Sequence, residues 1–240
     1  MQTIPIAESD RVFVLTGAGI SAESGLPTFR ASDGLWAGYN VEEICTPEAL
    51  QRNPALVWDF YSKRRADCAK ARPNPGHIAL AELEAQIPGR YFLCTQNVDD
   101  LHERAGSKNL VHMHGELAKS RCEGECGHPP VEDRAVYAGL DEVARCACGS
   151  RLRPHIVFFG EIPFEMQRIE REIAKCTLML VIGTSGNVYP AAGFVHWARQ
   201  ARAKTVYIGP ERPLNAEAFT QIVEGKAGEV LPGLFVVGRN

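Results

Sequence analysis

The chain has 240 residues, of which 45% are hydrophobic and 23% are charged, and its formal net charge is −3. This length and apolar content can build one substantial core with a smaller satellite, and they exclude a peptide or a disordered linker. A chain with this net negative charge has no overall electrostatic attraction to nucleic acids. No run approaches the roughly 18 apolar residues of a membrane-spanning helix. Because no export signal is recognisable either, we expect a cytoplasmic monomer without nucleic-acid or membrane partners.

The first predicted element is a buried strand over residues 11–16, which runs into closely spaced glycines. Gly17, Gly19 and Ala22 match the loose G-x-G-x-x-G/A spacing, and backbone amides in such a turn can approach a phosphate. Glycine pairs also close ordinary strand-to-helix turns, so this motif alone leaves both interpretations open.

Strands and helices alternate along most of the chain. Further strands are predicted over residues 90–95, 178–183 and 205–209, and helices over 76–86, 163–175 and 191–203. The alternation predicts an α/β fold with a doubly wound, mostly parallel sheet, whose ligands bind at the carboxyl ends of the strands. Polar motifs do follow the second and third strands, at residues 95–102 and 183–190.

Eight cysteines are of two kinds. Two close pairs, in a chain without an export signal, favour a metal over disulfides. Four thiolates fill the shell of one structural zinc ion, although a region that has lost its metal is the alternative. The pairs are Cys122 with Cys126 and Cys146 with Cys148. The isolated cysteines, expected to be small buried hydrophobes, are Cys45, Cys68, Cys94 and Cys176.

Two stretches interrupt the alternation, and we interpret them as insertions that together form a smaller domain. One is helical, over residues 34–75, and the other is cysteine-bearing and strand-poor, over residues 116–154. The remaining segments, 1–33, 76–115 and 155–240, are predicted to form a discontinuous Rossmann-like domain that binds a nucleotide.

Residues 111–115, VHMHG, place His112 and His114 on the same side of an extended chain. A lone histidine is more often a structural residue than a catalyst. His114 directly precedes the cysteine-bearing insertion, where a cleft between the two domains is expected. It is therefore the better candidate for a catalytic base.

These motifs together resemble the sirtuins, the NAD-dependent protein lysine deacylases. The resemblance spans nearly the whole chain and implies NAD and one structural zinc ion as cofactors, with acylated-lysine proteins or peptides as substrates. In that chemistry the acyl oxygen attacks the nicotinamide ribose, and a base then deprotonates a ribose hydroxyl, so that lysine, nicotinamide and acyl-ADP-ribose are released. The matching segments are residues 17–21, 25–30, 95–99, 114–115, the four paired cysteines, 158–161 and 183–185.

The resemblance also implies roles for single residues. His114 matches the general base, and Asn97 is the second catalytic residue. The positions matched to NAD binding are Gly17, Ala18, Gly19, Ile20, Ser21, Ala22, Thr28, Phe29, Arg30, Trp36, Gln96, Asn97, Val98, Asp99, His114, Gly183, Thr184, Ser185, Gly209, Pro210, Glu211 and Ala227. A substrate peptide is expected to add as a strand between two edges, formed by Val157, Phe158, Phe159, Gly160 and Glu161, and by Gly186, Asn187 and Val188.

The predicted helix around residues 56–65 bears on the acyl group. Tyr61 and Arg64 share its apolar stripe, so Arg64 is expected to point inward while Lys63 and Arg65 stay solvated. An internal salt bridge is the plainer interpretation. The resemblance implies instead the Tyr-x-x-Arg pair of sirtuins that remove succinyl, malonyl or glutaryl groups, whose carboxylate suits a guanidinium. We favour this second interpretation.

The chain departs from the sirtuin pattern at a few positions. Thr28 replaces a frequent aspartate, and Gly209 with Pro210 replaces a more usual asparagine-containing stretch. Cys45 is expected where an alanine often lines the acyl pocket, which would narrow that pocket.

Two rival functions remain on the sequence alone. One is a protein mono-ADP-ribosyltransferase, and the other is a non-catalytic NAD-sensing zinc module. The presence of Asn97 and His114 argues against the sensor, and Tyr61 with Arg64 argues against a pure transferase.

Overall fold

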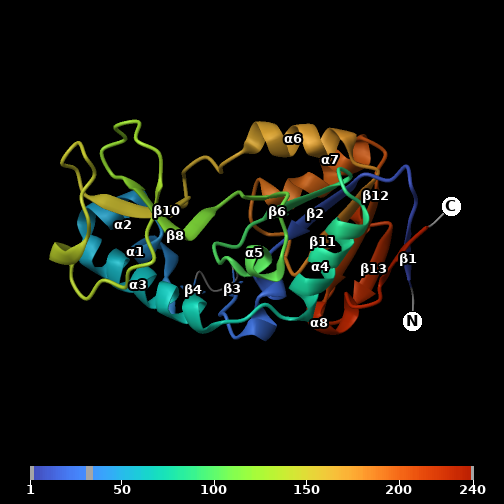
Figure 1. The fold of residues 1–240 in the computed structure, drawn as a ribbon, viewed down its shortest axis with the longest axis horizontal. Coiled ribbons are helices and arrows are strands. Elements are labelled where there is room, and N and C mark those ends of the chain that lie inside the picture. Colours follow the sequence, from blue (N-terminus) through green and yellow to red (C-terminus); the bar gives the residue numbers. More distant parts are fainter. Residues whose placement is uncertain (1–2, 31–34, 239–240) are drawn as a thin grey trace.

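The computed structural model describes residues 3–30 and 35–238. It has two lobes at opposite ends of its long axis, one built on a large sheet and one on short helices with a small sheet (Figure 1). Both chain ends lie at the far side of the larger lobe, where β1 (Ile4–Ile6) pairs in parallel with β14 (Phe235–Val237). Within the described ranges, no helix combines the length and apolar character that crossing a membrane requires.

The larger lobe is organised by a six-stranded sheet of order β13-β12-β11-β2-β6-β7, in which every neighbouring pair is parallel. Read in chain order this is the 3-2-1-4-5-6 arrangement of dinucleotide-binding folds. The predicted doubly wound α/β fold is therefore confirmed, with its reversal of strand order between β2 and β11. The strands are β2 (Val12–Thr16), β6 (Tyr91–Thr95), β7 (Leu110–His112), β11 (Leu178–Ile182), β12 (Lys204–Gly209) and β13 (Gln221–Glu224).

Alternate residues of these strands face two separate apolar cores. In β2, Val14 packs with Leu80 of one core, whereas Phe13 packs with Ile173 and Phe194 of the other. Because helices cover both faces, the strands are apolar throughout, as buried parallel strands must be. The covering helices are α4 (Pro75–Gln86) and α8 (Ala227–Val230) on one face, and α6 (Met166–Lys175) and α7 (Phe194–Gln200) on the other.

Short turns complete this lobe. β2 leads into two 3₁₀ turns rather than a long helix, and a 3₁₀ turn precedes α7 where one helix over 191–203 was predicted. The 3₁₀ turns of this lobe are η1 (Ala18–Ile20), η2 (Ala22–Ser24), η4 (Ala191–Gly193) and η5 (Ala216–Ala218), and its short helix is α5 (Leu101–Ala105).

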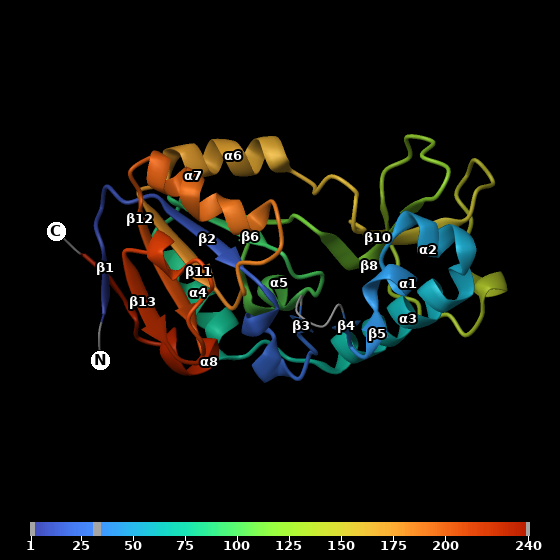
Figure 2. The ribbon, with the colours of Figure 1, turned by 180° about the vertical axis from the view of Figure 1, so that it is seen from behind.

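The smaller lobe joins two segments that lie far apart in the sequence (Figure 2). Its helices are α1 (Val41–Ile44), α2 (Pro47–Arg52) and α3 (Pro54–Lys70), preceded by the short strands β3 (Phe29–Arg30), β4 (Leu35–Trp36) and β5 (Tyr39–Asn40). Against α3 lies a sheet of order β10-β8-β9. It comprises β8 (Gly115–Cys122), β9 (Val131–Glu132) and β10 (Leu152–Ile156), with η3 (Leu140–Glu142) in the loop between β9 and β10.

The expectation that residues 116–154 are strand-poor is wrong, because β8 alone has eight residues. Its buried positions, including Leu117 and Cys122, are separated by one or two half-exposed residues, a pattern typical of a strand with one face buried. β8 begins within the segment that we assigned to the larger lobe, so the predicted domain boundaries stay a prediction.

The expectation that Arg65 is solvated is also wrong. Its Nε donates to the carbonyl oxygen of Leu117 at 2.8 Å, and its Nη1 lies 3.1 Å from Oδ2 of Asp133. Arg65 is buried because its side chain reaches across to the cysteine-bearing insertion. There it donates hydrogen bonds to backbone carbonyl oxygens of the insertion. Lys63, as expected, stays exposed beside Asp59.

Candidate active site

Two glycine turns meet at the carboxyl ends of β2 and β11. The amide of Gly19 donates to the carbonyl oxygen of Gly183 at 2.8 Å, and that of Gly17 donates to Ile182 at 3.0 Å. A Cβ on Gly19 would lie only 2.7 Å from the Cα of Gly183. The glycines are therefore required for this backbone contact, and their two amides already donate within the protein rather than toward a phosphate.

A hydrogen-bonded cluster brings together three residues that sequence motifs had matched to NAD. Nδ2 of Asn97 lies 3.1 Å from Oγ of Ser21, which donates to Oδ2 of Asp99 at 3.0 Å. Asn97 also donates to the carbonyl oxygen of Gly17 at 3.2 Å. All three side chains are buried, and burial raises the pKa of Asp99. The cluster thus fixes the loop after β6 against the first glycine turn.

His114 lies beside this loop in a form suited to accept a proton. Its Nδ1 lies 3.2 Å from the carbonyl oxygen of Gln96, so Nδ1 carries the hydrogen and Nε2 keeps a lone pair. Burial lowers the pKa of His114 to about 4, so the imidazole is neutral near pH 7. The side-chain amide of Gln96 in turn donates to Oγ1 of Thr184 at 3.2 Å, which links this histidine to the loop after β11.

In His112, unlike His114, both ring nitrogens have hydrogen-bond partners among the described residues. Its Nδ1 lies 2.8 Å from the carbonyl oxygen of Asn97 and its Nε2 lies 2.7 Å from Oε1 of Glu103. Burial alone would lower the pKa of His112, but its hydrogen bond to Glu103 raises it. Glu116 lies close to this pair and is itself matched by Lys119 at 2.9 Å. The histidine that we judged the weaker candidate is therefore held in a charge-balanced cluster.

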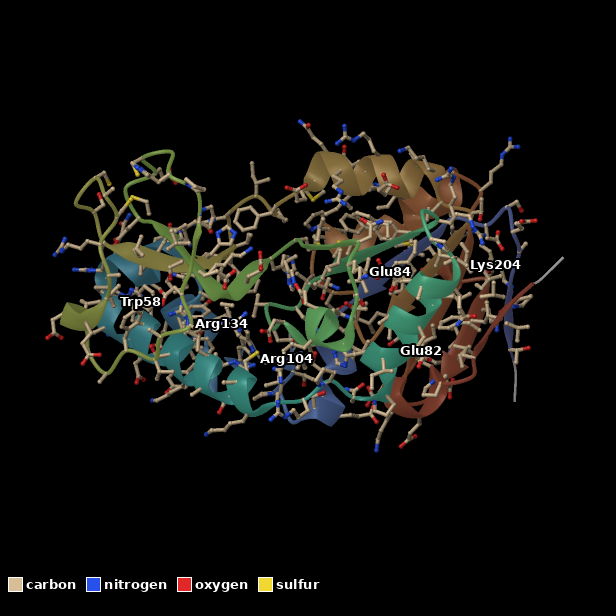
Figure 3. The ribbon with its side chains drawn as sticks, in the orientation of Figure 1. Trp58, Glu82, Glu84, Arg104, Arg134 and Lys204 are labelled. Carbon is tan, nitrogen blue, oxygen red and sulfur yellow. The ribbon has the colours of Figure 1, made fainter. Side chains whose placement is uncertain are left out.

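This cluster lines a cavity of about 420 Å³. On its wall, Asp100 binds Arg134 of the cysteine-bearing insertion at 2.7 Å and Arg104 of α5 at 3.4 Å. Figure 3 labels both arginines where the two lobes meet. Asp100 thus ties the insertion to the larger lobe directly after the loop that carries Asn97 and Asp99.

One predicted substrate edge, residues 157–161, is held by internal hydrogen bonds. The amide of Val157 donates to His114 and that of Phe159 donates to Cys45, both at 2.9 Å. The carboxylate of Glu161 folds back to accept from the amide of Phe158 at 2.7 Å. Its side chain therefore supports the edge from within.

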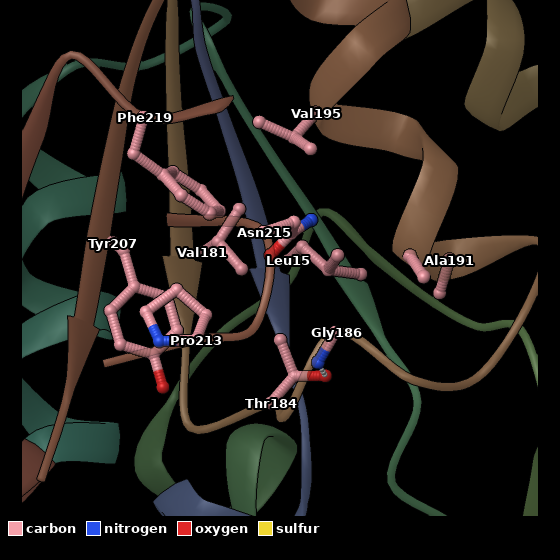
Figure 4. Close-up of a pocket in the computed structure, with 11 residues that line it drawn as sticks. Leu15, Val181, Thr184, Gly186, Ala191, Val195, Tyr207, Pro213, Asn215 and Phe219 are labelled. Carbon is pink, nitrogen blue, oxygen red and sulfur yellow. Dashed lines mark hydrogen bonds between the residues drawn. The ribbon is translucent and has the colours of Figure 1, made fainter. Parts of the chain in front are cut away.

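The other predicted edge, residues 186–188, follows the glycine turn after β11. The amide of Gly186 lies 3.5 Å from Oγ1 of Thr184, and both residues border a small cavity against Tyr207 and Asn215 (Figure 4). That cavity measures about 10 Å³, enough for one water molecule at most and far too little for a nucleotide. Ser185 and Asn187 are exposed beside it.

Tyr61 and Arg64 are both buried on α3, as predicted. Arg64 is 5% exposed, and within the described residues its Nε and Nη1 have no hydrogen-bond partner. The nearest carboxylate oxygen paired with it is Oδ2 of Asp67 at 3.9 Å. Burial lowers the pKa of Arg64. An internal salt bridge therefore does not account for this arginine.

Trp36 and Cys45 lie with this pair rather than with the glycine turns. The ring of Trp36 is 6.2 Å from that of Tyr61 and 5.6 Å from Cζ of Arg64. The hydroxyl of Tyr61 donates to Sγ of Cys45 at 3.2 Å. Cys45 thus lies against the residues expected to recognise the acyl group, and the assignment of Trp36 to NAD stays a prediction.

The four paired cysteines converge at the tip of the smaller lobe. Their Sγ atoms all lie within 4.8 Å of one another, and no disulfide joins any of the eight cysteines, all of which are described. Four thiolates at this spacing fit one structural zinc ion. The prediction of the metal centre is therefore confirmed. The four isolated cysteines are buried, also as predicted.

The remaining predicted NAD residues lie around the same edge of the sheet or outside the described part. Thr28 is half-buried before β3. The side chains of Phe29 and Arg30 are not described. Gly209 ends β12 with Pro210 and Glu211 exposed after it, and Ala227 is buried at the start of α8. Sequence reasoning missed Arg153, which is buried on β10, a strand whose burial pattern does not alternate.

Fold and site together define a class: a dinucleotide-binding α/β protein with an appended four-cysteine module and a neutral histidine between the two. The model of the Sir2 family matches residues 17–190. The chain belongs to this family.

Relatives and solved structures agree over most of the chain. NAD-dependent protein deacylases of Caulobacter vibrioides and Pasteurella multocida are 52% and 49% identical, each over 92% of this chain and over 94% and 95% of their own lengths. A Sir2 homologue solved with NAD is 40% identical and has a TM-score of 0.85, covering 95% of this chain and 89% of that one. A Sir2 complex with a p53 peptide and NAD+ has a TM-score of 0.79 at 29% identity, covering 92% and 90%.

Proposed function

We propose that this protein is an NAD-dependent protein-lysine deacylase that removes succinyl and malonyl groups as well as acetyl groups. The observation that carries the proposal is His114, held neutral with a free Nε2 beside the cluster of Ser21, Asn97 and Asp99. The printed names of the relatives, and the NAD, ADP-ribose and peptide complexes of the similar structures, support the same activity.

NAD, when bound, supplies an electrophilic ribose carbon from which nicotinamide departs. In our proposal Ser21, Asn97 and Asp99 orient the ribose and nicotinamide, because their mutual hydrogen bonds fix the side chains before the ligand arrives. Nε2 of His114 accepts the proton of a ribose hydroxyl, for which a neutral imidazole is required. The roles of Phe29 and Arg30 toward NAD stay predictions.

The substrate peptide is proposed to lie between residues 157–161 and 186–188, adding to their backbones as a strand. The amide of Val157 donates to the carbonyl oxygen of His114 at 2.9 Å, so this edge is attached directly to the residue that accepts the proton. The structural zinc ion takes no part in the chemistry, since four thiolates leave no open position. The metal instead holds the insertion that follows His114.

The acyl preference is the finer part of the proposal, and it rests on Arg64. A buried guanidinium whose Nε and Nη1 make no hydrogen bond is costly, and a carboxylate at the end of a succinyl or malonyl group supplies the missing acceptor. Tyr61 lies about one helical turn away on α3, and both side chains contact the ring of Trp36. This pair favours deacylation over the rival transferase.

A cytoplasmic location also belongs to the proposal. It is supported by cysteines that serve a metal rather than disulfides, which is typical of reducing compartments. Acylated proteins or peptides are the proposed partners.

The test is a mass-spectrometric assay with matched acetyl-, succinyl- and unmodified-lysine peptides, with and without NAD. We expect loss of both acyl groups only when NAD is present, with release of nicotinamide and acyl-ADP-ribose. Transfer of ADP-ribose onto the unmodified peptide would support the transferase instead. Binding of NAD without turnover of any peptide would support the sensor.

A further inference from the structure

Arg153 begins a row of side-chain contacts that ends at Tyr61. Its guanidinium carbon is 4.0 Å from the centre of the Phe158 ring. That ring stacks on Tyr61, with 6.0 Å between centres and 22° between planes. Phe158 is 1% exposed and Tyr61 is fully buried, so neither ring can move without displacing its neighbour. A change at Arg153 is therefore transmitted to Tyr61 by direct contact.

The same arginine fixes the backbone of the substrate edge. Its Nη1 and Nη2 bind the two carboxylate oxygens of Glu161 at 2.6 and 3.1 Å, and Nη2 also donates to Ile156 at 3.3 Å. The carboxylate accepts in turn from the amide of Phe158. Arg153 thus holds the ring of Phe158 directly and its backbone through Glu161.

This pairing separates the role of Arg153 from that of Arg64. Nη1 and Nη2 of Arg153 are both engaged by the carboxylate of Glu161 in a bidentate pair, so these two nitrogens are not free to bind the carboxylate of an acyl group. Arg64 has no such partner within the described residues. A buried ion pair is also weak evidence of a gain in stability, since apolar residues often serve as well. The planar guanidinium stacked on a ring is the feature that calls for arginine at this position.

We infer that Arg153 is a positioning residue for acyl recognition. Through Phe158 and Glu161 it holds the ring of Tyr61 at the distance from Arg64 that an acyl carboxylate requires. This inference rests on the proposed deacylase function and assigns to that function a residue that does not touch the substrate.

Arg121 provides a matched control. It binds the same carboxylate of Glu161, at 3.0 and 3.2 Å, but its guanidinium lies over Phe164 at 5.3 Å and not over Phe158. Replacing each arginine by lysine keeps the positive charge beside Glu161 and removes the planar fork. A difference between Arg153→Lys and Arg121→Lys therefore reports the contacts that Arg153 alone makes, the stack on Phe158 and the bidentate bonds to Glu161, rather than the charge.

The experiment measures kcat and KM of both variants with succinyl- and acetyl-lysine peptides at saturating NAD. For Arg153→Lys we expect KM for the succinyl peptide to rise by about tenfold or more, as displaced contact groups cause. We expect its kcat and its KM for NAD to change little. The kcat/KM of this variant for the acetyl peptide should fall less, so the succinyl-to-acetyl ratio of kcat/KM falls. Arg121→Lys should keep the wild-type ratio.

A second readout does not depend on activity. Amide hydrogen exchange at Phe158 should speed up in Arg153→Lys, because the Glu161 acceptor is no longer held, and should speed up less in Arg121→Lys. If Arg153→Lys fails to fold, Glu161→Gln is the substitute variant. It keeps an acceptor oxygen but loses the carboxylate that Arg153 holds, so amide exchange at Phe158 should also speed up.

Two outcomes would overturn the inference: an unchanged succinyl-to-acetyl ratio in Arg153→Lys, or an equal fall in Arg121→Lys. Absence of any NAD-dependent deacylation by the wild type would contradict the proposed function instead. In that case slower or unchanged exchange at Phe158 in the Arg153 variant would still overturn the positioning role, and faster exchange would support it.

Discussion

The guanidinium carbon of Arg64 lies 5.6 Å from the centre of the Trp36 ring, while its Nε and Nη1 have no hydrogen-bond partner among the described residues. The ring offers a cation a favourable face, but it accepts no hydrogen bond in the plane of the guanidinium. The aromatic contact therefore orients the side chain and leaves its donors available. An arginine held in this way is preorganised for an anion that arrives with the substrate.

Replacing Arg64 by Met should separate the two acyl activities. The change keeps much of the stem volume and removes the donors, so succinyl turnover should fall by about 2–3 kcal/mol in kcat/KM, the range for hydrogen bonds to charged groups. Acetyl turnover should change far less. The measurement is kcat/KM with matched peptides. Lys63→Met, on the exposed face of the same helix, is the control. Equal losses for both acyl groups would make Arg64 a structural residue.

Replacing His114 by Ala should abolish deacylation while NAD binding largely survives, because the residue is assigned to proton transfer and not to holding the cofactor. Calorimetric titration with NAD and the peptide assay measure the two effects separately. His112→Gln is the contrasting variant, since His112 contacts Glu103 and a backbone carbonyl rather than the proposed reacting groups. Turnover by His114→Ala at the wild-type rate would remove this histidine from the mechanism.

The pH dependence follows from the same residue. Because burial lowers the pKa of His114 to about 4, the base is neutral above that pH and protonated below it. The acid limb of kcat/KM that belongs to His114 should therefore lie near pH 4 in the free enzyme, well below the usual range of histidine. An acid limb of kcat/KM near pH 6.5 that persists when the other histidines are replaced would contradict the neutral, buried state of His114.

Sequence reasoning succeeded where local pattern and chemistry coincide. The apolar runs of β2, β6, β11 and β12 predicted a buried parallel sheet, since only strands covered on both faces are apolar throughout. The paired cysteines predicted the metal centre, because the four thiolates need only meet in space. The catalytic roles of Asn97 and His114, which come from the resemblance to the sirtuins, stay predictions.

It failed where a side chain's fate depends on a distant segment. Arg65 looked like part of a solvated charge run. Its hydrogen-bond acceptors instead come from the cysteine-bearing insertion, such as Leu117, which lies 52 residues later in the sequence. Trp36, which was matched to NAD, packs against α3, a contact that the sequence did not indicate, and its role toward NAD stays a prediction. The role of Arg153 depends on Phe158 and Tyr61 together, and no spacing in the sequence indicates that row of contacts.

Removal of the metal should unfold the smaller lobe before the larger one. We expect one zinc per chain by metal analysis, and its loss in Cys148→Ser should lower the thermal midpoint, since binding and local folding are coupled. Cys176→Ser is a control with an equal chemical change at a buried cysteine of the larger lobe. It should lower stability without loss of zinc. Protein purified without chelator that contains no zinc would contradict the assignment.

The last prediction concerns stability in acid. Burial lowers the pKa of His155 to about 4, from an ordinary value of 6.5. Between these two values the unfolded chain binds a proton on His155 that the folded chain does not. Stability therefore falls as the pH drops from about 6.5 toward about 4, and the contribution of His155 levels off below that.

Replacing His155 by Phe removes this titration and keeps a ring that can stack on Phe164, which lies 4.6 Å away with 14° between planes. The thermal midpoint of the variant should therefore decline less steeply than that of the wild type over this pH interval. His196→Gln, at an exposed position of α7, is the control and should keep the wild-type slope. Since His77 and His114 also have pKa values lowered to about 4, part of the acid loss must remain in His155→Phe. A slope identical to that of the wild type would show that His155 does not contribute to it.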